Sequence, residues 1–271
     1  MPLDILLNNG LLHLTLVWSL LSIVFLVASA QRDNSIMDIV YGPTFAITGI
    51  ALLLINERTD LASIAVISLV SLWALRLGVR IGRKNYGRPE DERYGAWRTV
   101  WMQRGTTYFL LRSYIQIYLL QGTVISLVSL PIILAITFPH ELLTPWLWVG
   151  VGIALFGLLY ESIADWQLDR FLARKRAGTE SAVLMTTGLF AYSRRPNYFG
   201  ETLVWWGLAI AVAPVSYGWL AFVSPLVITY IVTRITGPML EAVFLDRYPT
   251  EYQAYMDRTS YMIPRLKKSS V

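Results

Sequence analysis

Residues 192–213 read Tyr-Ser-Arg-Arg-Pro-Asn-Tyr-Phe-Gly-Glu-Thr-Leu-Val-Trp-Trp-Gly-Leu-Ala-Ile-Ala-Val-Ala, a polar cluster that leads directly into an apolar run. A proline has its φ already set for the first turn of a helix, and it lacks the N–H that would be unpaired there. The stretch therefore predicts a membrane helix that begins at Pro196 and runs through Trp205 and Ala209.

The polar part of this stretch has the composition of an anion site. Arg194 and Arg195 flank the positive end of the predicted helix, and a guanidinium can hold a phosphate through two hydrogen bonds. Asn197 and Glu201 are four residues apart and therefore share a helix face. A carboxylate costs about 2.5–3.5 kcal/mol at mid-bilayer and less near a helix end, so Glu201 is expected to have a partner or a function. The alternative is that the arginines are ordinary cytoplasmic anchors and Glu201 pairs with one of them.

The composition indicates an integral membrane protein. Of the 271 residues, 55% are hydrophobic and only 15% are charged, which is too apolar for a soluble domain. No Ser-, Gly- or Pro-rich linker divides the chain, so we expect one polytopic, all-α domain over residues 1–271. The chain has no cysteine and only His13 and His140, so we expect neither a disulfide nor a Cys- or His-ligated metal.

Seven apolar runs are expected to cross the membrane as helices, since about 20 apolar residues span the hydrocarbon core. They are residues 11–30, 39–55, 61–79, 108–138, 146–164, 198–213 and 218–235. We expect a kink at Gly42-Pro43, a turn at residues 139–141 and an amphipathic remainder from residue 237 onward.

The basic residues predict the orientation of these spans. If the N-terminus is outside, residues 31–38, 76–105, 165–195 and 234–271 are cytoplasmic, and they hold all but two of the 23 lysines and arginines. The positive-inside rule therefore predicts an N-out, C-in topology. It also explains the net charge of +5 without nucleic acid, and it places a cofactor site on the cytosolic side.

Several polar residues are expected near the cytoplasmic boundary besides the 192–201 cluster. Glu161 and Asp165 share one face of the fifth predicted helix. The polar segment after the third span contributes Arg76, Arg80, Arg98 and Arg104. Arginines can hold phosphates, and carboxylates can accept from ribose hydroxyls. Interhelical ion pairs are the alternative for both sets, and Asp38 and Tyr41 are weaker candidates.

Residues 188–201, Gly-Leu-Phe-Ala-Tyr-Ser-Arg-Arg-Pro-Asn-Tyr-Phe-Gly-Glu, resemble the signature of the steroid 5-alpha-reductase superfamily, and more closely that of its uncharacterised bacterial branch. Similarity extends to residues 33–39, 90–94, 120–122, 164–167 and 247–264. The resemblance runs from about residue 31 to the end, with the C-terminal reductase-like region at about residues 110–271.

The resemblance implies a seven-helix reductase of the bacterial inner membrane that binds NADPH in a cavity open to the cytosol. It implies reduction of an activated C=C bond in a lipid or steroid-like substrate, such as a 3-oxo-Δ4 steroid. Asn197, Glu201 and Asp165 would contact the cofactor, with Gln121 and the arginines of the polar segment nearby. Glu161, Tyr198 and Glu241 complete the candidate cofactor-binding residues.

The chain departs from the steroid reductases in its expected catalytic residues. Those enzymes use a Gln-Glu pair in the second helix and a tyrosine in the N-terminal half to polarise the substrate carbonyl. No Gln-Glu dipeptide occurs here, and the nearest analogue, Asn56-Glu57, lies in a predicted outer turn. Asp38, Tyr41 and Glu57 are therefore the candidate catalytic residues.

Two other functions remain open at this point. Methyltransferases that use S-adenosylmethionine on prenylated or phospholipid substrates share an Arg-x-Pro-x-Tyr-like element and a late glutamate, which Glu241 would match. A non-enzymatic lipid-binding protein, with a purely structural polar ring, is the second alternative. The complete Asn197–Glu201 motif and the number of arginines favour the reductase, because NADPH carries three phosphates and S-adenosylmethionine carries none.

Overall fold

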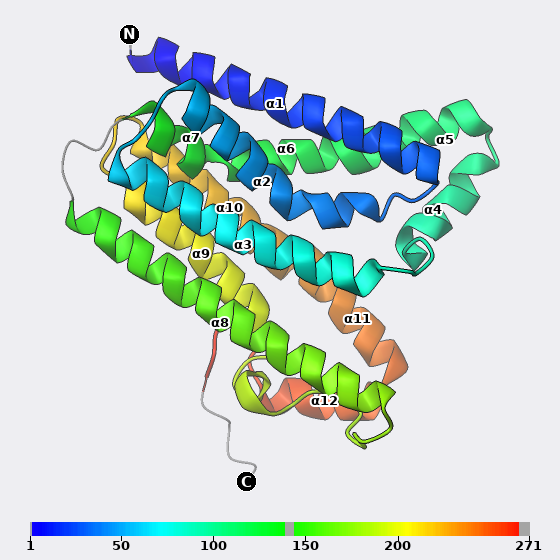
Figure 1. The fold of residues 1–271 in the computed structure, drawn as a ribbon. Coiled ribbons are helices and arrows are strands. Elements are labelled where there is room, and N and C mark those ends of the chain that lie inside the picture. The colour runs from blue at the N-terminus through cyan, green and yellow to red at the C-terminus, as the bar shows by residue number, and fades with distance from the viewer. Residues whose placement is uncertain (1, 139–143, 266–271) are drawn as a thin grey trace. The chain divides into compact units, whose positions relative to one another are not determined.

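The computed structural model describes residues 2–138 and 144–265 (Figure 1). The turn predicted at residues 139–141 lies outside the described residues, as does the end of the amphipathic remainder, residues 266–271. The described part of the chain contains no β-strand, and a single isolated parallel bridge joins Ser193 to Ser260. The prediction of an all-α fold is confirmed.

Five described helices are long and apolar enough to cross a membrane: Pro2–Gln31, Ile36–Ile55, Leu61–Asn85, Pro145–Arg176 and Gly218–Arg247. Thr106–Val128 and Leu130–Thr137 would add a sixth if they form one span, although they are bent by 47° at the break between them. These helices indicate a polytopic membrane protein. The count of seven and the N-out, C-in orientation stay predictions.

Two predictions about helix boundaries need correction. The first helix, α1, begins at Pro2 and not at residue 11. Pro2 suits a first turn, and the carboxylate of Asp4 there complements the helix dipole, so the polar start remains helical. The second helix, α2 (Ile36–Ile55), begins at Ile36 and not at residue 39, and it contains Pro43, the position of the predicted kink.

The chain forms two compact units, and each is described by itself. Unit one comprises Met1–Leu147 with Val212–Ser224, and unit two comprises Trp148–Ala211 with Pro225–Val271. Besides α1 and α2, unit one contains α3 (Leu61–Asn85), α4 (Glu92–Met102), α5 (Thr106–Ser113), the π-helical turn η1 (Tyr114–Leu119), α6 (Leu120–Val128), α7 (Leu130–Thr137) and η3 (Gly218–Phe222).

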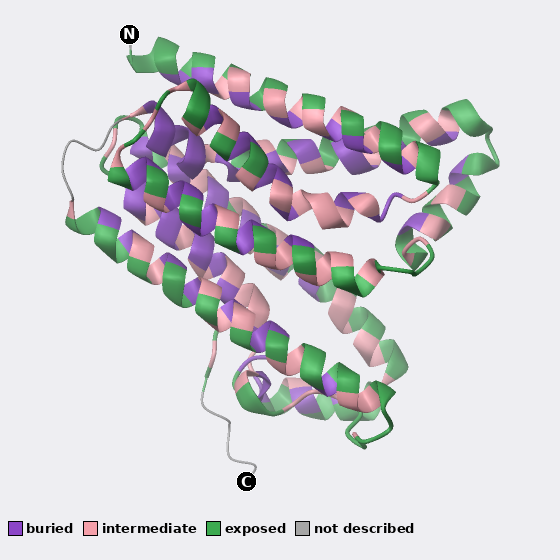
Figure 2. Ribbon diagram, viewed as in Figure 1, coloured by how far each residue is buried: buried purple, intermediate pink, exposed green. Residues whose placement is uncertain are grey.

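The core of unit one lies around α7. Every residue from Pro131 to Thr137 is buried, and Figure 2 shows this short helix almost wholly in the colour of buried residues. It packs against α1, α2, α3 and η3. At one contact the side-chain amide of Asn9 on α1 donates a 3.1 Å hydrogen bond to the hydroxyl of Thr137. The buried side-chain amide of Asn9 is therefore paired across helices, as a low-dielectric interior requires.

Unit two contains most of α8 (Pro145–Arg176), the 3₁₀ turn η2 (Gly188–Ala191), α9 (Pro196–Val212), most of α10 (Val223–Tyr230), the π-helical turn η4 (Ile231–Thr236), α11 (Gly237–Arg247) and α12 (Pro249–Arg258). The predicted start of α9 at Pro196 is confirmed.

Glycines set the distance between α8 and α9. A Cβ added to Gly157 would lie 2.7 Å from the carbonyl oxygen of Gly200, and one added to Gly207 would lie 2.5 Å from the carbonyl oxygen of Gly150. Residue numbers rise along α8 while their partners on α9 fall, so the two helices are antiparallel. Such contacts between small residues bring backbones together and stabilise helix pairs in membranes.

Candidate functional site

The glycine contact brings most of the predicted cofactor-binding residues of unit two together. A Cβ on Gly200 would lie 2.6 Å from the backbone nitrogen of Glu161, which places Glu161 beside the first turns of α9. Asp165 follows one turn later on α8, and both carboxylates are buried. Arg195, Glu201 and Asp165 lie close enough to the phenol of Tyr198 to act on it electrostatically. The site is therefore a cluster of charged side chains at the place where α8 passes the start of α9.

Arg195 is held at this place by its backbone and by aromatic rings. Its N–H donates to the carbonyl oxygen of Tyr261 at 3.0 Å. Its guanidinium carbon lies 5.8 Å from the ring centre of Tyr198 and 5.4 Å from that of Phe244. Nε and Nη2 of Arg195 are buried, and within residues 2–138 and 144–265 neither atom has a hydrogen-bond partner. A guanidinium in this state can receive an anion.

Arg194 has a different environment. Its Nε and Nη2 both donate to Oε1 of Glu241, at 2.9 and 2.7 Å, and its Nη1 donates to the carbonyl oxygens of Met256 and Thr259. Only 8% of the residue is exposed. Both Arg194 and Glu241 are predicted to bind the cofactor. The structure pairs them with each other, because Glu241 on α11 lies within reach of the guanidinium.

The chain after α12 lies alongside residues 192–195. The backbone N–H of Arg194 donates to the carbonyl oxygen of Ser260 at 2.9 Å, and the backbone N–H of Arg265 donates to the carbonyl oxygen of Tyr192 at 3.0 Å. The hydroxyl of Ser193 donates to the carbonyl oxygen of Met262 at 2.7 Å. The C-terminal segment, residues 259–265, therefore holds the loop that carries Arg194 and Arg195.

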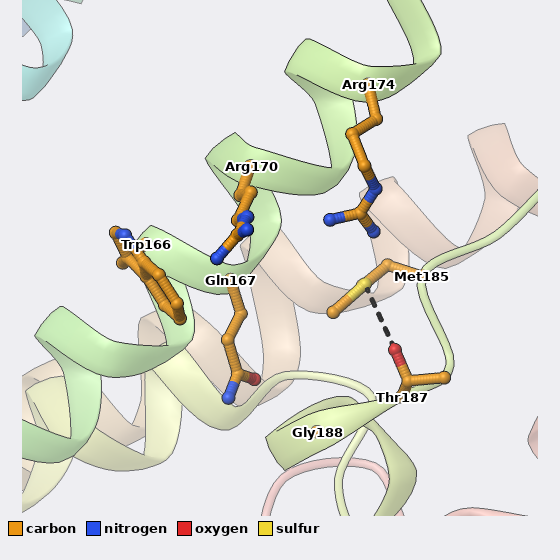
Figure 3. Close-up of a pocket in the computed structure, with 7 residues that line it drawn as sticks. All are labelled: Trp166, Gln167, Arg170, Arg174, Met185, Thr187 and Gly188. Atoms are coloured by element: carbon orange, nitrogen blue, oxygen red, sulfur yellow. Dashed lines mark hydrogen bonds between the residues drawn. The ribbon is translucent and has the colours of Figure 1, made fainter. Parts of the chain in front are cut away.

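A pocket of about 220 Å³ lies beside the later turns of α8 (Figure 3). Its lining residues are Trp166, Gln167, Arg170, Arg174, Met185, Thr187 and Gly188. The guanidinium carbon of Arg170 lies 5.4 Å from the ring centre of Trp166, and Arg174 holds Glu180 through Nε and Nη2 at 3.1 and 2.9 Å. The pocket thus combines an aromatic face with two guanidiniums.

The opposite wall of this pocket depends on one glycine. Oε1 of Gln167 accepts the backbone N–H of Leu189 at 2.9 Å. Gly188 has φ +61°, and a Cβ there would lie 2.4 Å from Oε1 of Gln167. Only glycine accepts both the left-handed backbone and this close approach.

Unit one contains a second polar cluster, around Asp38. The hydroxyl of Tyr94 donates to Oδ1 of Asp38 at 2.7 Å, and Nη2 of Arg93 donates to Oδ2 at 2.7 Å. Burial and then the charge of Asp38 raise the pKa of Tyr94, while a hydrogen bond with Gln121 acts in the opposite direction. Tyr94 is therefore a neutral, buried phenol oriented by a carboxylate.

The same cluster joins the sequence segments that carried the resemblance. The N–H of Asn34 donates to Oε1 of Glu90 at 2.8 Å, and that of Asp91 donates to the hydroxyl of Ser35 at 2.7 Å. Arg98 donates to the two carboxylate oxygens of Glu90 through Nε and Nη2, at 2.7 and 2.8 Å. Residues 33–39 and 90–94 are thus joined by hydrogen bonds. Arg98, which is predicted to bind a cofactor, is paired with the carboxylate of Glu90.

Residues 24–259 match the family described as protein of unknown function (DUF1295). The chain belongs to this family. An uncharacterized protein of Schizosaccharomyces pombe is 28% identical over 227 residues, which are 74% of this chain and 63% of the relative. The match thus spans less than two thirds of that longer protein. No solved structure gave a significant match.

The remaining predicted residues of the DUF1295 protein lie away from the Asp38 cluster or have other partners. Glu57 is exposed in the turn after α2, with φ +50°, at the opposite end of that helix from Asp38. At 1.5 Å per residue the two are roughly 28 Å apart, so Glu57 does not share a site with Asp38. Arg104 is exposed and lies over the ring of Tyr108 at 5.2 Å.

Three other predicted residues of unit one are placed as follows. Tyr41, one turn after Asp38, packs edge-on against Phe45 at 5.4 Å. Arg76 and Arg80 lie in the last turns of α3, and neither is without a partner.

Three residues of interest in this DUF1295 protein were not predicted from the sequence. Tyr94 was quoted only as part of a motif, because its partner Asp38 is 56 positions earlier in the chain. Arg170 and Arg174 were counted only as cytoplasmic charges. The four-residue spacing of Trp166, Arg170 and Arg174 was the available signal, since it places all three along one face of α8.

Proposed function

We propose that this DUF1295 protein is an NADPH-dependent membrane reductase of the steroid 5-alpha-reductase superfamily, in its bacterial branch. It would act on an activated C=C bond of a lipid or steroid-like substrate, from the cytosolic side of a seven-span, N-out protein in the inner membrane. The observation that carries the proposal is the convergence of Asp165, Arg195, Tyr198 and Glu201 where α8 passes the start of α9.

The residues of unit two suit a phosphorylated nucleotide. Arg195 has a buried guanidinium edge that no group in the described part of the chain accepts from, and burying such a donor costs about 1–3 kcal/mol unless a ligand pairs with it. The pocket beside α8 adds Trp166, whose ring suits a planar base, and Arg170. S-adenosylmethionine carries no phosphate for these arginines, and Glu241, which supported that alternative, already binds Arg194.

The Asp38 cluster of unit one, considered by itself, contains a hydrogen-bond donor suited to a substrate carbonyl. When bound, NADPH supplies a hydride to the β-carbon of an enone. A donor at the carbonyl oxygen stabilises the enolate that develops. We assign this contact to Tyr94, which burial keeps neutral. To make it, the hydroxyl would turn its one proton from Oδ1 of Asp38 to the carbonyl oxygen of the substrate. Asp38 is then a positioning residue.

A thermal-shift comparison of the purified protein with NADPH, NADH and S-adenosylmethionine tests the proposal. A ligand that binds only the folded state stabilises it by about 2.7 kcal/mol at 100 times its dissociation constant. We expect stabilisation by NADPH. Stabilisation by S-adenosylmethionine alone would favour the methyltransferase, and no shift with any nucleotide would favour a lipid-binding protein.

A further inference from the structure

Arg194 and Arg195, the two adjacent arginines before α9, differ in what the Nε and Nη2 atoms of the guanidinium contact. Arg194 places Nε and Nη2 on Glu241, and Arg98 in unit one places the same two atoms on Glu90. This edge offers two parallel N–H groups, which match two oxygens of a carboxylate or phosphate. In Arg195 both atoms are buried and neither has a hydrogen-bond partner among the described residues.

The surroundings of Arg195 keep its side chain in place. The guanidinium lies against the rings of Tyr198 and Phe244, at 5.8 and 5.4 Å. The backbone N–H of Arg195 donates to the carbonyl oxygen of Tyr261 and to the hydroxyl of Ser193, at 3.0 and 3.1 Å. A ligand on this unpaired edge would therefore meet a largely preorganised donor, which lowers the entropy cost of binding.

Three features beside Arg195 favour an anion, against the repulsion from the nearby carboxylates of Asp165 and Glu201. Glu241 is neutralised by Arg194 at 2.7 Å, so it does not compete for Arg195. Burial raises the pKa of Tyr261 to about 12, so this phenol is neutral at physiological pH. Arg195 directly precedes Pro196, the first residue of the 17-residue helix α9, whose N-terminal dipole also attracts negative charge.

We propose that Arg195 binds one phosphate group side-on through Nε and Nη2, and that Arg194 has the structural role of holding α11 and the C-terminal segment. This assignment deepens the proposed function, on which it rests for the identity of the ligand: a dinucleotide would bring the phosphate. A lipid headgroup could bring the same phosphate chemistry, and the experiment separates the two sources.

The test uses the full-length protein in a non-ionic detergent without phosphate. Thermal shifts are titrated with inorganic pyrophosphate, with NADPH and, as an uncharged control, with adenosine. The variants are Arg195→Gln, Arg195→Lys and the exposed matched control Arg258→Gln, which removes the same charge from α12. We expect pyrophosphate to bind the wild type and Arg258→Gln equally and Arg195→Gln at least tenfold more weakly. Arg195→Lys should be intermediate, because an ammonium keeps the charge and lacks the fork.

The outcomes separate this assignment from the proposed function. Equal pyrophosphate affinity in wild type and Arg195→Gln overturns the assignment, and so does the absence of any pyrophosphate shift in the wild type. If pyrophosphate binds through Arg195 and NADPH does not bind, the assignment stands and the reductase proposal fails. If NADPH binds wild type and Arg195→Gln equally, the assignment fails and the reductase proposal stands.

A lipid arm identifies the source of the phosphate. The same variants are melted in mixed micelles with phosphatidic acid or, as a control, phosphatidylcholine. A shift with phosphatidic acid that Arg195→Gln abolishes, together with no shift from NADPH, assigns the site to a lipid phosphate. If Arg195→Gln without ligand melts well below the wild type, the variant is destabilised and its phosphate affinity cannot be interpreted. The phosphate affinity of Arg195→Lys, which keeps the charge, is then compared with that of the wild type. Equal phosphate affinity in Arg195→Lys and wild type then overturns the bidentate assignment.

Discussion

The hydroxyl of Tyr94 on α4 donates a 2.7 Å hydrogen bond to Oδ1 of Asp38 on α2, and Arg93 holds the other oxygen of the same carboxylate. If Tyr94 contacts the substrate carbonyl, Tyr94→Phe should lower turnover by about 100-fold, the scale for removing one oxyanion donor. NADPH affinity should be unchanged. NADPH consumption with a 3-oxo-Δ4 steroid measures the first quantity and calorimetric titration the second. A variant with full turnover would remove Tyr94 from the mechanism.

The ion pair of Arg194 and Glu241 should contribute strongly to stability. Arg194→Ala leaves the Glu241 carboxylate, 17% exposed, without its partner, and breaking such a pair costs about 3–5 kcal/mol. Arg258→Ala, at an exposed position, should change stability by no more than about 0.5 kcal/mol. Chemical denaturation in detergent measures both. Similar effects for the two variants would show that the Arg194 pair is not structural.

The glycine contact between α8 and α9 should tolerate no side chain. Gly157→Ala would place Cβ 2.7 Å from backbone atoms of α9, so we expect a loss of about 1–3 kcal/mol. Gly152→Ala is the matched control on the same helix, because nothing lies within 4 Å of its Cβ. There alanine should stabilise by up to about 1 kcal/mol. Equal melting temperatures for the two variants would contradict the close packing.

Asp91 should contribute a pH dependence to folding. Burial acts to raise the pKa of Asp91, but hydrogen bonds and the charge of Arg93 outweigh burial and hold the pKa below its usual value of 3.8. A lowered folded-state pKa gives stability that is complete above the unfolded pKa and is lost as the pH falls through the folded pKa. Asp91→Asn should therefore show a smaller loss of stability below about pH 4 than the wild type. Parallel acid-denaturation curves for the two proteins would exclude this contribution.

Asn197 tests the motif without a change of charge. It lies on α9 with Glu201 four residues later, on the same helix face. Asn197→Ala should weaken NADPH binding about tenfold, the scale of one lost hydrogen bond, while the melting temperature without ligand stays close to that of the wild type. Loss of folding in detergent would instead support a structural role for the motif.

Local chemistry made parts of the structure predictable. The start of α9 follows from Pro196 alone, because proline sets the first helical turn without reference to distant residues. The helical class follows from the long apolar runs. The start of α1 was missed because an apolar count ignores the polar residues before residue 11, although Leu6 and Asn9 are buried in the fold.

The roles of single side chains depended on partners far away in the sequence. Arg194 and Arg195 are neighbours of the same type, and nothing local distinguishes them. The difference arises from Glu241, which lies 47 residues after Arg194 in the sequence. Of the two arginines, Glu241 forms an ion pair with Arg194. Long-range pairing of this kind also kept Tyr94 from being predicted as a partner of Asp38.

Calorimetric titration of the full-length protein with NADPH tests the central claim most directly. The account predicts saturable one-site binding, with a dissociation constant of about 1 mM or tighter, that is weakened in Asn197→Ala and retained in Arg258→Gln. The absence of NADPH binding to the folded wild-type protein, with binding of S-adenosylmethionine in its place, would contradict it.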